Sequence, residues 1–120
     1  MNFIDSLKNC TKLYRLELAF CKFQGVFPRS IGNLSDQLGY LNLYGNNLHG
    51  NLPASIGNLV GLLGLCLGRN QFTGSIPSTI GKLQKLQYFN LSENQLSGQL
   101  PDALGNLSSL NNIFFCIQTS

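Results

Sequence analysis

The four prolines of this 120-residue chain recur at an almost constant spacing, and this spacing constrains the fold more than any other feature. Successive prolines lie 25, 24 and 24 residues apart, and a glycine stands three residues before each of them. These positions are Gly25 and Pro28, Gly50 and Pro53, Gly74 and Pro77, and Gly98 and Pro101. Glycine permits a tight bend, and proline fixes φ and has no N–H for a strand ladder. The pattern therefore predicts a stack of similar coils.

Ahead of each bend, two apolar residues flank one residue of another kind, which is the alternation of a short strand. The pairs are Leu16 and Leu18, Leu41 and Leu43, Leu65 and Leu67, and Phe89 and Leu91. Three residues further on, an asparagine amide can donate to and accept from backbone groups that leave the sheet. These structural ladder positions are Cys21, Asn46, Asn70 and Asn94. On the far side of each coil, Ile31, Ile56, Ile80 and Leu104 are expected to close a shared core, because one coil cannot bury its apolar residues alone.

The complete pattern, LxxLxxLxLxxNxLxGxIPxxIGNL, resembles the plant-specific class of leucine-rich repeat. With Asn9-Cys10-Thr11 and the SIGNLS stretch from Ser30 to Ser35, the chain is similar to the extracellular domains of plant leucine-rich-repeat receptor-like kinases, particularly immune receptors for microbial proteins. The resemblance implies a right-handed α/β leucine-rich-repeat solenoid. It would have a parallel sheet on its concave side and short 3₁₀ or irregular segments on its convex side.

We expect a single array over residues 1–120, with repeats at about 13–37, 38–61, 62–85 and 86–109 and partial repeats at 1–12 and 110–120. The sequence contains neither the capping segments of the related receptors nor a recognisable signal peptide, transmembrane stretch or kinase domain. It is therefore interpreted as an interior slice of such an ectodomain or the product of a truncated gene. Family resemblance implies that the protein lies on the extracellular face of the plasma membrane or is secreted.

Charge and motifs argue against other classes of function. Charged residues make up 11% of the chain, and the net charge of +3 is not clustered as in a nucleic-acid-binding surface. His49 is expected in a solvated turn, and no serine or cysteine nucleophile with an acidic partner has a repeat position near it. The acids are scattered and no phosphate-binding loop is present. We therefore expect no enzyme activity, no cofactor, no metal and no membrane contact by this chain itself.

The four cysteines do not have the spacing of a zinc or redox motif. Cys10 and Cys21 replace core and ladder residues, so they are expected to pack inside the protein. Cys66 and Cys116 are expected on the open face of the sheet, two strands apart, which is beyond disulfide reach.

Four N-x-[ST] triplets indicate possible glycosylation sites. Asn9, Asn33 and Asn106 share one phase of the repeat and are expected along the convex side, whereas Asn90 lies in the middle of a strand. Such triplets also arise by chance in a chain rich in asparagine, serine and leucine. The shared phase favours a secreted origin.

The outward strand positions form the candidate functional surface. The candidate partner-binding residues among them are Arg15, Glu17, Phe20, Tyr40, Asn42, Tyr44, Arg69, Tyr88, Asn90 and Glu93. Parallel sheets are normally covered on both faces, and exposed aromatic residues and arginine are common anchors at protein interfaces. The surface therefore indicates a protein or peptide ligand, with a co-receptor as a further partner. The alternative is that the tyrosines only shield the strand edges. Arg69 and Glu93 could form an ion pair, but an exposed pair contributes little to stability.

The resulting hypothesis is a non-catalytic recognition module, similar to the ligand-sensing segment of a plant receptor-like kinase in defence or development. Two alternatives are a secreted inhibitor of microbial cell-wall-degrading enzymes and a truncated gene product with only a structural role.

Overall fold

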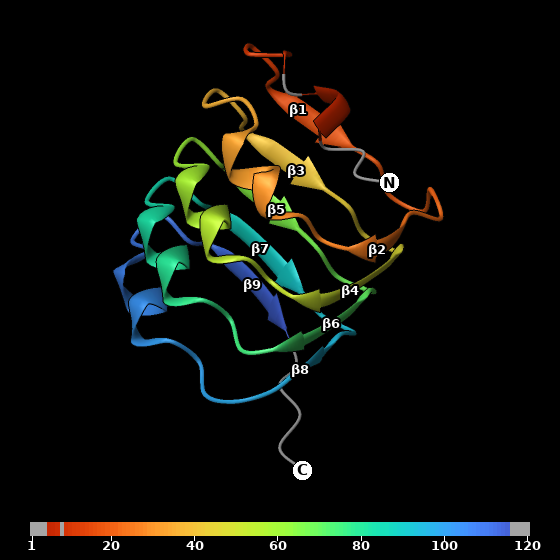
Figure 1. The fold of residues 1–120 in the computed structure, drawn as a ribbon. Coiled ribbons are helices and arrows are strands. Elements are labelled where there is room, and N and C mark those ends of the chain that lie inside the picture. Colours follow the sequence, from red (N-terminus) through yellow and green to blue (C-terminus); the bar gives the residue numbers. More distant parts are fainter. Residues whose placement is uncertain (1–4, 8, 116–120) are drawn as a thin grey trace.

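The computed structural model describes residues 5–7 and 9–115, which form a three-sided solenoid (Figure 1). One side is a parallel sheet with the strand order β1-β3-β5-β7-β9. Its strands are β1 (Arg15–Glu17), β3 (Tyr40–Asn42), β5 (Gly64–Cys66), β7 (Tyr88–Leu91) and β9 (Asn112–Phe115). Arg15 pairs with Tyr40, Tyr40 with Gly64 and Gly64 with Tyr88, so neighbouring coils stack one repeat apart. The predicted solenoid with a parallel sheet is confirmed.

A second parallel sheet forms another side, where we expected only a turn or an irregular return. Its strands, in the order β2-β4-β6-β8, are β2 (Gln24–Val26), β4 (Asn47–Asn51), β6 (Gln71–Gly74) and β8 (Gln95–Leu96). His49 lies in β4 and is exposed, so its expected place in a turn was wrong. Because every coil extends its backbone at the same phase, each such segment finds a hydrogen-bonding neighbour in the next coil.

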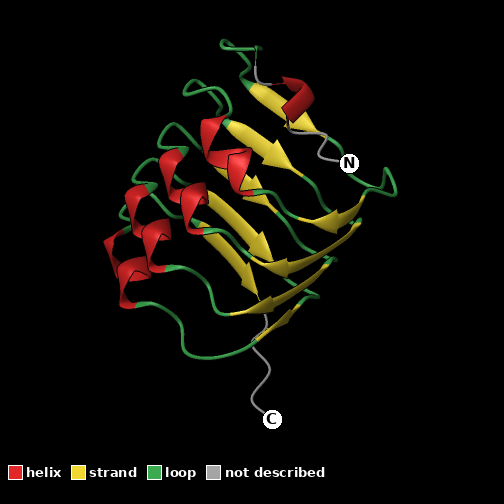
Figure 2. Cartoon of the chain, in the orientation of Figure 1, coloured by secondary structure: helices red, strands yellow, loops and turns green. Residues whose placement is uncertain are grey.

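The third side is a row of 3₁₀ helices, which Figure 2 shows in red on the side of the solenoid away from the strands. The helices are η2 (Arg29–Asn33), η3 (Ala54–Asn58), η4 (Ser78–Lys82) and η5 (Asp102–Asn106), and η1 (Asp5–Leu7) precedes β1. Each of η2 to η5 follows one of the four prolines, whose extended backbone leads into the helix. The helices stack so closely that a side chain on Gly57 would collide with the backbone carbonyl of Thr79.

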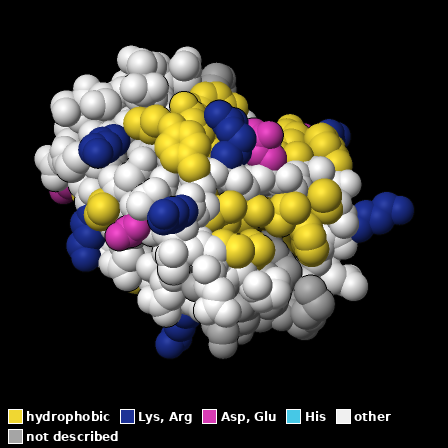
Figure 3. All heavy atoms as spheres, turned by 90° about the horizontal axis from the view of Figure 1, so that it is seen from above, with side chains coloured by type: hydrophobic (Ala, Val, Ile, Leu, Met, Phe, Trp, Pro, Cys, Tyr) yellow, Lys and Arg dark blue, Asp and Glu magenta, His cyan; other side chains and the backbone are white. Residues whose placement is uncertain are grey.

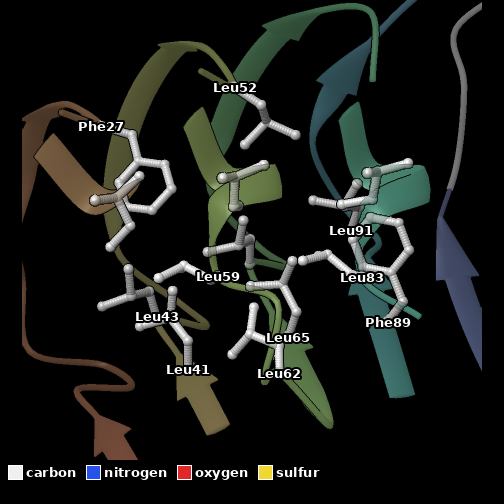
Figure 4. Packing of buried hydrophobic residues seen from close by; sticks show 14 of the residues in the cluster. Phe27, Leu41, Leu43, Leu52, Leu59, Leu62, Leu65, Leu83, Phe89 and Leu91 are labelled. Atoms are coloured by element: carbon white, nitrogen blue, oxygen red, sulfur yellow. The ribbon is translucent and has the colours of Figure 1, made fainter. Parts of the chain in front are cut away.

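Apolar side chains from all three sides fill the interior (Figure 4). The five-stranded sheet contributes Leu41, Leu43, Leu65, Leu67, Phe89 and Leu91. Leu48, Phe72 and Leu96 enter from the second sheet, and Ile31, Ile56 and Ile80 enter from the 3₁₀ helices. Leu104, at the corresponding place in η5, is only half-buried. The apolar residues of the strands and those of the 3₁₀ helices, which recur once in each repeat, therefore pack in one continuous core.

The three ladder asparagines are buried, with 6%, 7% and 8% of the surface of Asn46, Asn70 and Asn94 exposed. The Nδ2 group of Asn70 donates to the carbonyls of Leu43 (3.0 Å) and Leu67 (3.1 Å), while its Oδ1 accepts from the N–H of Leu48 at 3.1 Å. The amides of Asn46 and Asn94 make the same kind of contacts. No described buried side-chain nitrogen or oxygen lacks a partner.

Cys10 and Cys21 are exposed, so the prediction that they pack inside the protein was wrong. At the ladder position of the first coil, the Cys21 thiol donates to the carbonyl of Ala19 at 3.5 Å. β1 is the edge strand of its sheet, and no strand among the described residues pairs with its other side. Leu16 and Leu18 are half-buried for this reason. Cys66 is a free thiol, and Cys116 lies outside the described residues.

The end of the stack that carries β1 shows apolar patches beside basic and acidic side chains (Figure 3). Tyr14, Phe20 and Val26 belong to this end, with 51%, 63% and 63% of their surface exposed. At the other end, Ile113 on β9 is 38% exposed. Within the described part of the chain, no helix has the length and apolarity needed to cross a bilayer.

Candidate recognition surface

The outer side of the five-stranded sheet brings the ten predicted contact residues together. We call this surface the open face; it consists of Arg15 and Glu17 on β1, Tyr40 and Asn42 on β3, Tyr88 and Asn90 on β7, and Phe20, Tyr44, Arg69 and Glu93 just after the strands. The alternation along each strand sends its apolar neighbours inward and these side chains outward. No helix or strand among the described residues covers the open face (Figure 1).

At one end of the open face, Arg15 holds Tyr40 in place. The guanidinium carbon of Arg15 lies 4.1 Å from the centre of the Tyr40 ring, and Nη1 of Arg15 lies 3.0 Å from Oε1 of Glu17. Tyr14 packs edge-on against Tyr40, with 5.7 Å between the ring centres. Sequence reasoning missed Tyr14, although its position directly before β1 could have indicated it. The cation–π contact and the ring contact together fix the Tyr40 ring.

The middle of the open face is hollowed. A depression of about 150 Å³ lies between Tyr40 and Tyr88, with Gly64 and Cys66 of β5 in its lining. Glu17 and Asn42 also border it. Cys66 is half-buried, and this burial raises the pKa of its thiol, against a smaller lowering effect from the backbone of Gly68. Because the thiolate is the reactive form, the shift makes Cys66 a weak nucleophile near neutral pH.

At the other end of the open face, one side chain bridges across a whole coil. The Tyr44 hydroxyl donates to Oε2 of Glu93 at 3.2 Å, and the ring of Tyr44 passes over Gly68 in the coil between them. The partly buried position of Tyr44 and then the hydrogen bond to Glu93 raise the pKa of its hydroxyl. Nε of Arg69 lies 3.9 Å from Oε1 of Glu93, a pairing that the sequence had allowed. Phe20 packs edge-on against Tyr44 at 5.5 Å.

The two asparagines of the open face serve the backbone as well as the surface. Oδ1 of Asn42 accepts from the N–H of Tyr44 at 3.1 Å, and Oδ1 of Asn90 accepts from the N–H of Ser92 at 2.9 Å. These contacts turn the chain out of the strand, a role that we did not predict. Nδ2 of Asn90 also donates to the hydroxyl of Tyr88 at 3.2 Å, which orients that ring.

The other candidate glycosylation residues lie away from the open face. Asn33 and Asn106 are the last residues of η2 and η5, and both are exposed, as is Asn9. Asn90, by contrast, is half-buried on β7. In the described part of the chain, no group of His, Cys, Asp and Glu has the arrangement of a metal site. The open face therefore offers aromatic contact area and hydrogen-bonding side chains.

A family model described as a leucine-rich repeat region matches residues 1–119. The chain belongs to the leucine-rich-repeat family. This membership accounts for the constant proline spacing and the asparagine ladder, and it confirms the fold that the repeat pattern implied.

Comparison with individual proteins places this leucine-rich-repeat chain beside plant receptors. It is 47% identical over 65 residues to the receptor kinase-like protein Xa21 of Oryza sativa subsp. japonica, an alignment that covers 54% of the chain and 6% of Xa21. The chain spans only this small part of the relative's length.

Two solved structures extend the comparison over most of the chain. The leucine-rich-repeat ectodomain of the Arabidopsis thaliana membrane receptor kinase GASSHO1/SCHENGEN3, in complex with CASPARIAN STRIP INTEGRITY FACTOR 2, matches with a TM-score of 0.84 and 38% identity over 90% of this chain and 14% of that one. The plant peptide hormone receptor RGFR1 in complex with RGF2 matches with a TM-score of 0.87 and 36% identity over 93% of this chain and 18% of that one. The expected resemblance to plant receptor kinase ectodomains is confirmed, and the matched region is a non-catalytic module.

Proposed function

We propose that this chain is a recognition segment that binds a protein or peptide ligand on its open face, as part of receptor signalling in defence or development. The observation that carries the proposal is the uncovered parallel sheet, whose tyrosines and arginines are held in place by neighbouring side chains. Arg15 contacts Tyr40 and Glu17, Glu93 contacts Tyr44 and Arg69, and the amide of Asn90 contacts Tyr88. Fixed aromatic side chains lose little conformational entropy when a partner binds. The ligand-bound state of RGFR1 supports a peptide as one class of partner.

The same proposal places the segment outside the cell, on a plasma-membrane receptor or in a secreted protein, with a co-receptor as a second partner. Glycans on Asn9, Asn33 or Asn106 would project from exposed positions and leave the open face accessible. A glycan on Asn90 would instead cover it. Mass spectrometry of the protein secreted from plant cells should find glycans at Asn33 and Asn106 and none at Asn90; the reverse distribution would contradict this arrangement.

The function is tested by selecting random displayed peptides on the wild-type chain and measuring their affinity for a double variant, Tyr40→Ala with Tyr88→Ala. We expect the double variant to lower affinity about tenfold or more, because large aromatic anchors carry much of the energy at protein interfaces. His49→Ala is the matched control, since His49 is exposed on β4 of the other sheet. Equal affinity in the wild type and the double variant would remove the open face as the binding surface.

A further inference from the structure

The depression in the middle of the open face lies between two tyrosine rings on strands that are two positions apart in the sheet. We name it the Gly64 socket and define it by Tyr40, Gly64, Cys66 and Tyr88, with Glu17 and Asn42 at its border. We infer that the Gly64 socket receives one uncharged, apolar side chain of about the size of leucine from the protein or peptide that binds the open face. This inference rests on the proposed function and adds to it the chemical class of the central anchor.

The socket exists because one column of the sheet lacks a side chain at its centre. Tyr40, Gly64 and Tyr88 pair directly across β3, β5 and β7, so two rings stand on either side of a glycine. A Cβ atom at Gly64 would lie 3.0 Å from Cδ1 of Tyr40, closer than normal packing allows. The Tyr40 ring therefore leans over Gly64, and any larger residue at this position would take up the space that the socket offers.

Contacts outside the socket hold both of its walls before any ligand binds. The guanidinium carbon of Arg15 lies 4.1 Å from the centre of the Tyr40 ring, and the centre of the Tyr14 ring lies 5.7 Å from it. On the opposite wall, Nδ2 of Asn90 donates to the Tyr88 hydroxyl at 3.2 Å. A cavity whose walls are already ordered costs less entropy to fill, so a single side chain inserted here gives more of its contact energy to binding.

Charge and size select the occupant. Every charged side chain of the open face has an opposite partner, with Arg15 beside Glu17 at 3.0 Å and Arg69 beside Glu93 at 3.9 Å. A charged occupant would therefore find no unpaired opposite charge, and it would lose hydration next to two rings. An apolar occupant gains by leaving water. The volume of about 150 Å³ is that of a cavity able to hold a molecule of the size of benzene.

The bridge between Tyr44 and Glu93 limits how far an occupant can extend. It crosses the coil of β5 at Gly68, where an added Cβ would lie 2.9 Å from Cε2 of Tyr44 and 2.8 Å from Oδ1 of Asn90. The space along β5 is therefore filled beyond Cys66. A long aromatic side chain would have to displace this bridge, whereas a leucine, isoleucine or methionine would not.

The test uses the same random peptide library on the full chain, with a counter-selection on Gly64→Val, which fills the socket. We expect the wild type to enrich peptides with one invariant leucine, isoleucine or methionine and Gly64→Val to lower their affinity about tenfold or more. Gly105→Val is the matched control, because nothing lies within 4 Å of a Cβ at Gly105. In a Cys10→Ser, Cys21→Ser, Cys116→Ser background, a bound peptide should slow alkylation of Cys66 by iodoacetamide.

The outcomes separate the socket from the function. Peptides that need Tyr40 and Tyr88 but bind Gly64→Val as tightly as the wild type, or whose invariant residue is charged, would overturn the socket and leave the open-face function standing. Enriched peptides that tolerate every open-face substitution, or no enrichment at all, would overturn both. If circular dichroism shows that Gly64→Val does not fold, Tyr88→Ala decides: a widened socket should shift selection towards phenylalanine and tryptophan, and an unchanged preference contradicts the proposal.

Discussion

Single asparagine side chains connect the coils of this protein. The amide of Asn70 binds carbonyls of its own coil and of the preceding one, while its oxygen accepts a backbone N–H of the preceding coil. An aspartate could accept but not donate, and an apolar side chain could do neither. The backbone groups that turn out of the sheet therefore require a side chain that both donates and accepts, as asparagine does. For this reason the role of the asparagine could be predicted from sequence spacing alone.

Asn70→Ala should destabilise the fold by about 3 kcal/mol, because it leaves several buried backbone groups without partners at about 1–3 kcal/mol each. The measurement is the free energy of unfolding in urea. Asn47→Ala is the control: Asn47 lies in β4 and is exposed, so its loss should change stability by less than about 0.5 kcal/mol. A similar loss in the two variants would show that the buried amide is not what joins the coils.

Cys66 should react with iodoacetamide more slowly than Cys21 at about pH 8. Cys66 is half-buried and burial raises the pKa of its thiol, whereas Cys21 is exposed. A raised pKa leaves a smaller thiolate fraction below it, so alkylation of Cys66 should increase as the pH rises through that pKa. Peptide mass spectrometry over time gives both rates in one sample. Faster labelling of Cys66 would contradict the burial found for it.

At the level of elements, the sequence predicted the strands and helices that are marked by residue type. It did not predict the strands that depend on backbone pairing between neighbouring coils. Apolar alternation located β3, β5 and β7, and the prolines located the starts of η2 to η5. The second sheet was missed because its strands are held by backbone pairing between coils, and their polar residues look like those of a turn.

A second ladder, made of hydroxyl groups, was also missed. Oγ of Ser55 donates to the carbonyl of Arg29 at 2.6 Å, and Oγ1 of Thr79 donates to the carbonyl of Ala54 at 2.7 Å. Each bond joins one 3₁₀ helix to the helix before it. The recurrence of serine or threonine two residues after the proline could have indicated this ladder. Ala103 breaks it in the last described coil, since it has no hydroxyl.

Gly57→Ala should destabilise the fold by about 2 kcal/mol, within the range of about 1–3 kcal/mol for overpacking. The added methyl group would overlap the Thr79 carbonyl, which the hydroxyl ladder and the 3₁₀ helix keep from moving away. Gly105→Ala places the same methyl group at the same phase of the repeat with nothing within 4 Å. Urea unfolding should therefore separate the two variants. Equal stabilities would mean that the helices do not pack as closely as described.

For the whole molecule, the sequence predicted which residues share the open face but not the shape of that face. The repeat period alone puts Tyr40, Gly64 and Tyr88 side by side. The socket depends on how Tyr40 leans over the glycine and on the contacts of Arg15 and Asn90 that hold the rings. Such orientations result from packing between coils, which a one-dimensional pattern does not contain.

The stacking of coils also predicts how stability varies along the molecule. Leu16, Leu41 and Leu65 pair across β1, β3 and β5 at one phase, so the same substitution can be compared in three successive coils. Leu65 and Leu41 are 0% and 1% exposed, whereas Leu16 is only half-buried. Leu65→Ala and Leu41→Ala should each cost about 3 kcal/mol and Leu16→Ala about 1 kcal/mol, because the cost follows the buried volume that is lost. Urea unfolding followed by circular dichroism measures all three. If Leu16→Ala cost as much as Leu65→Ala, the coil of β1 would have to be covered on both sides, which the described residues do not show.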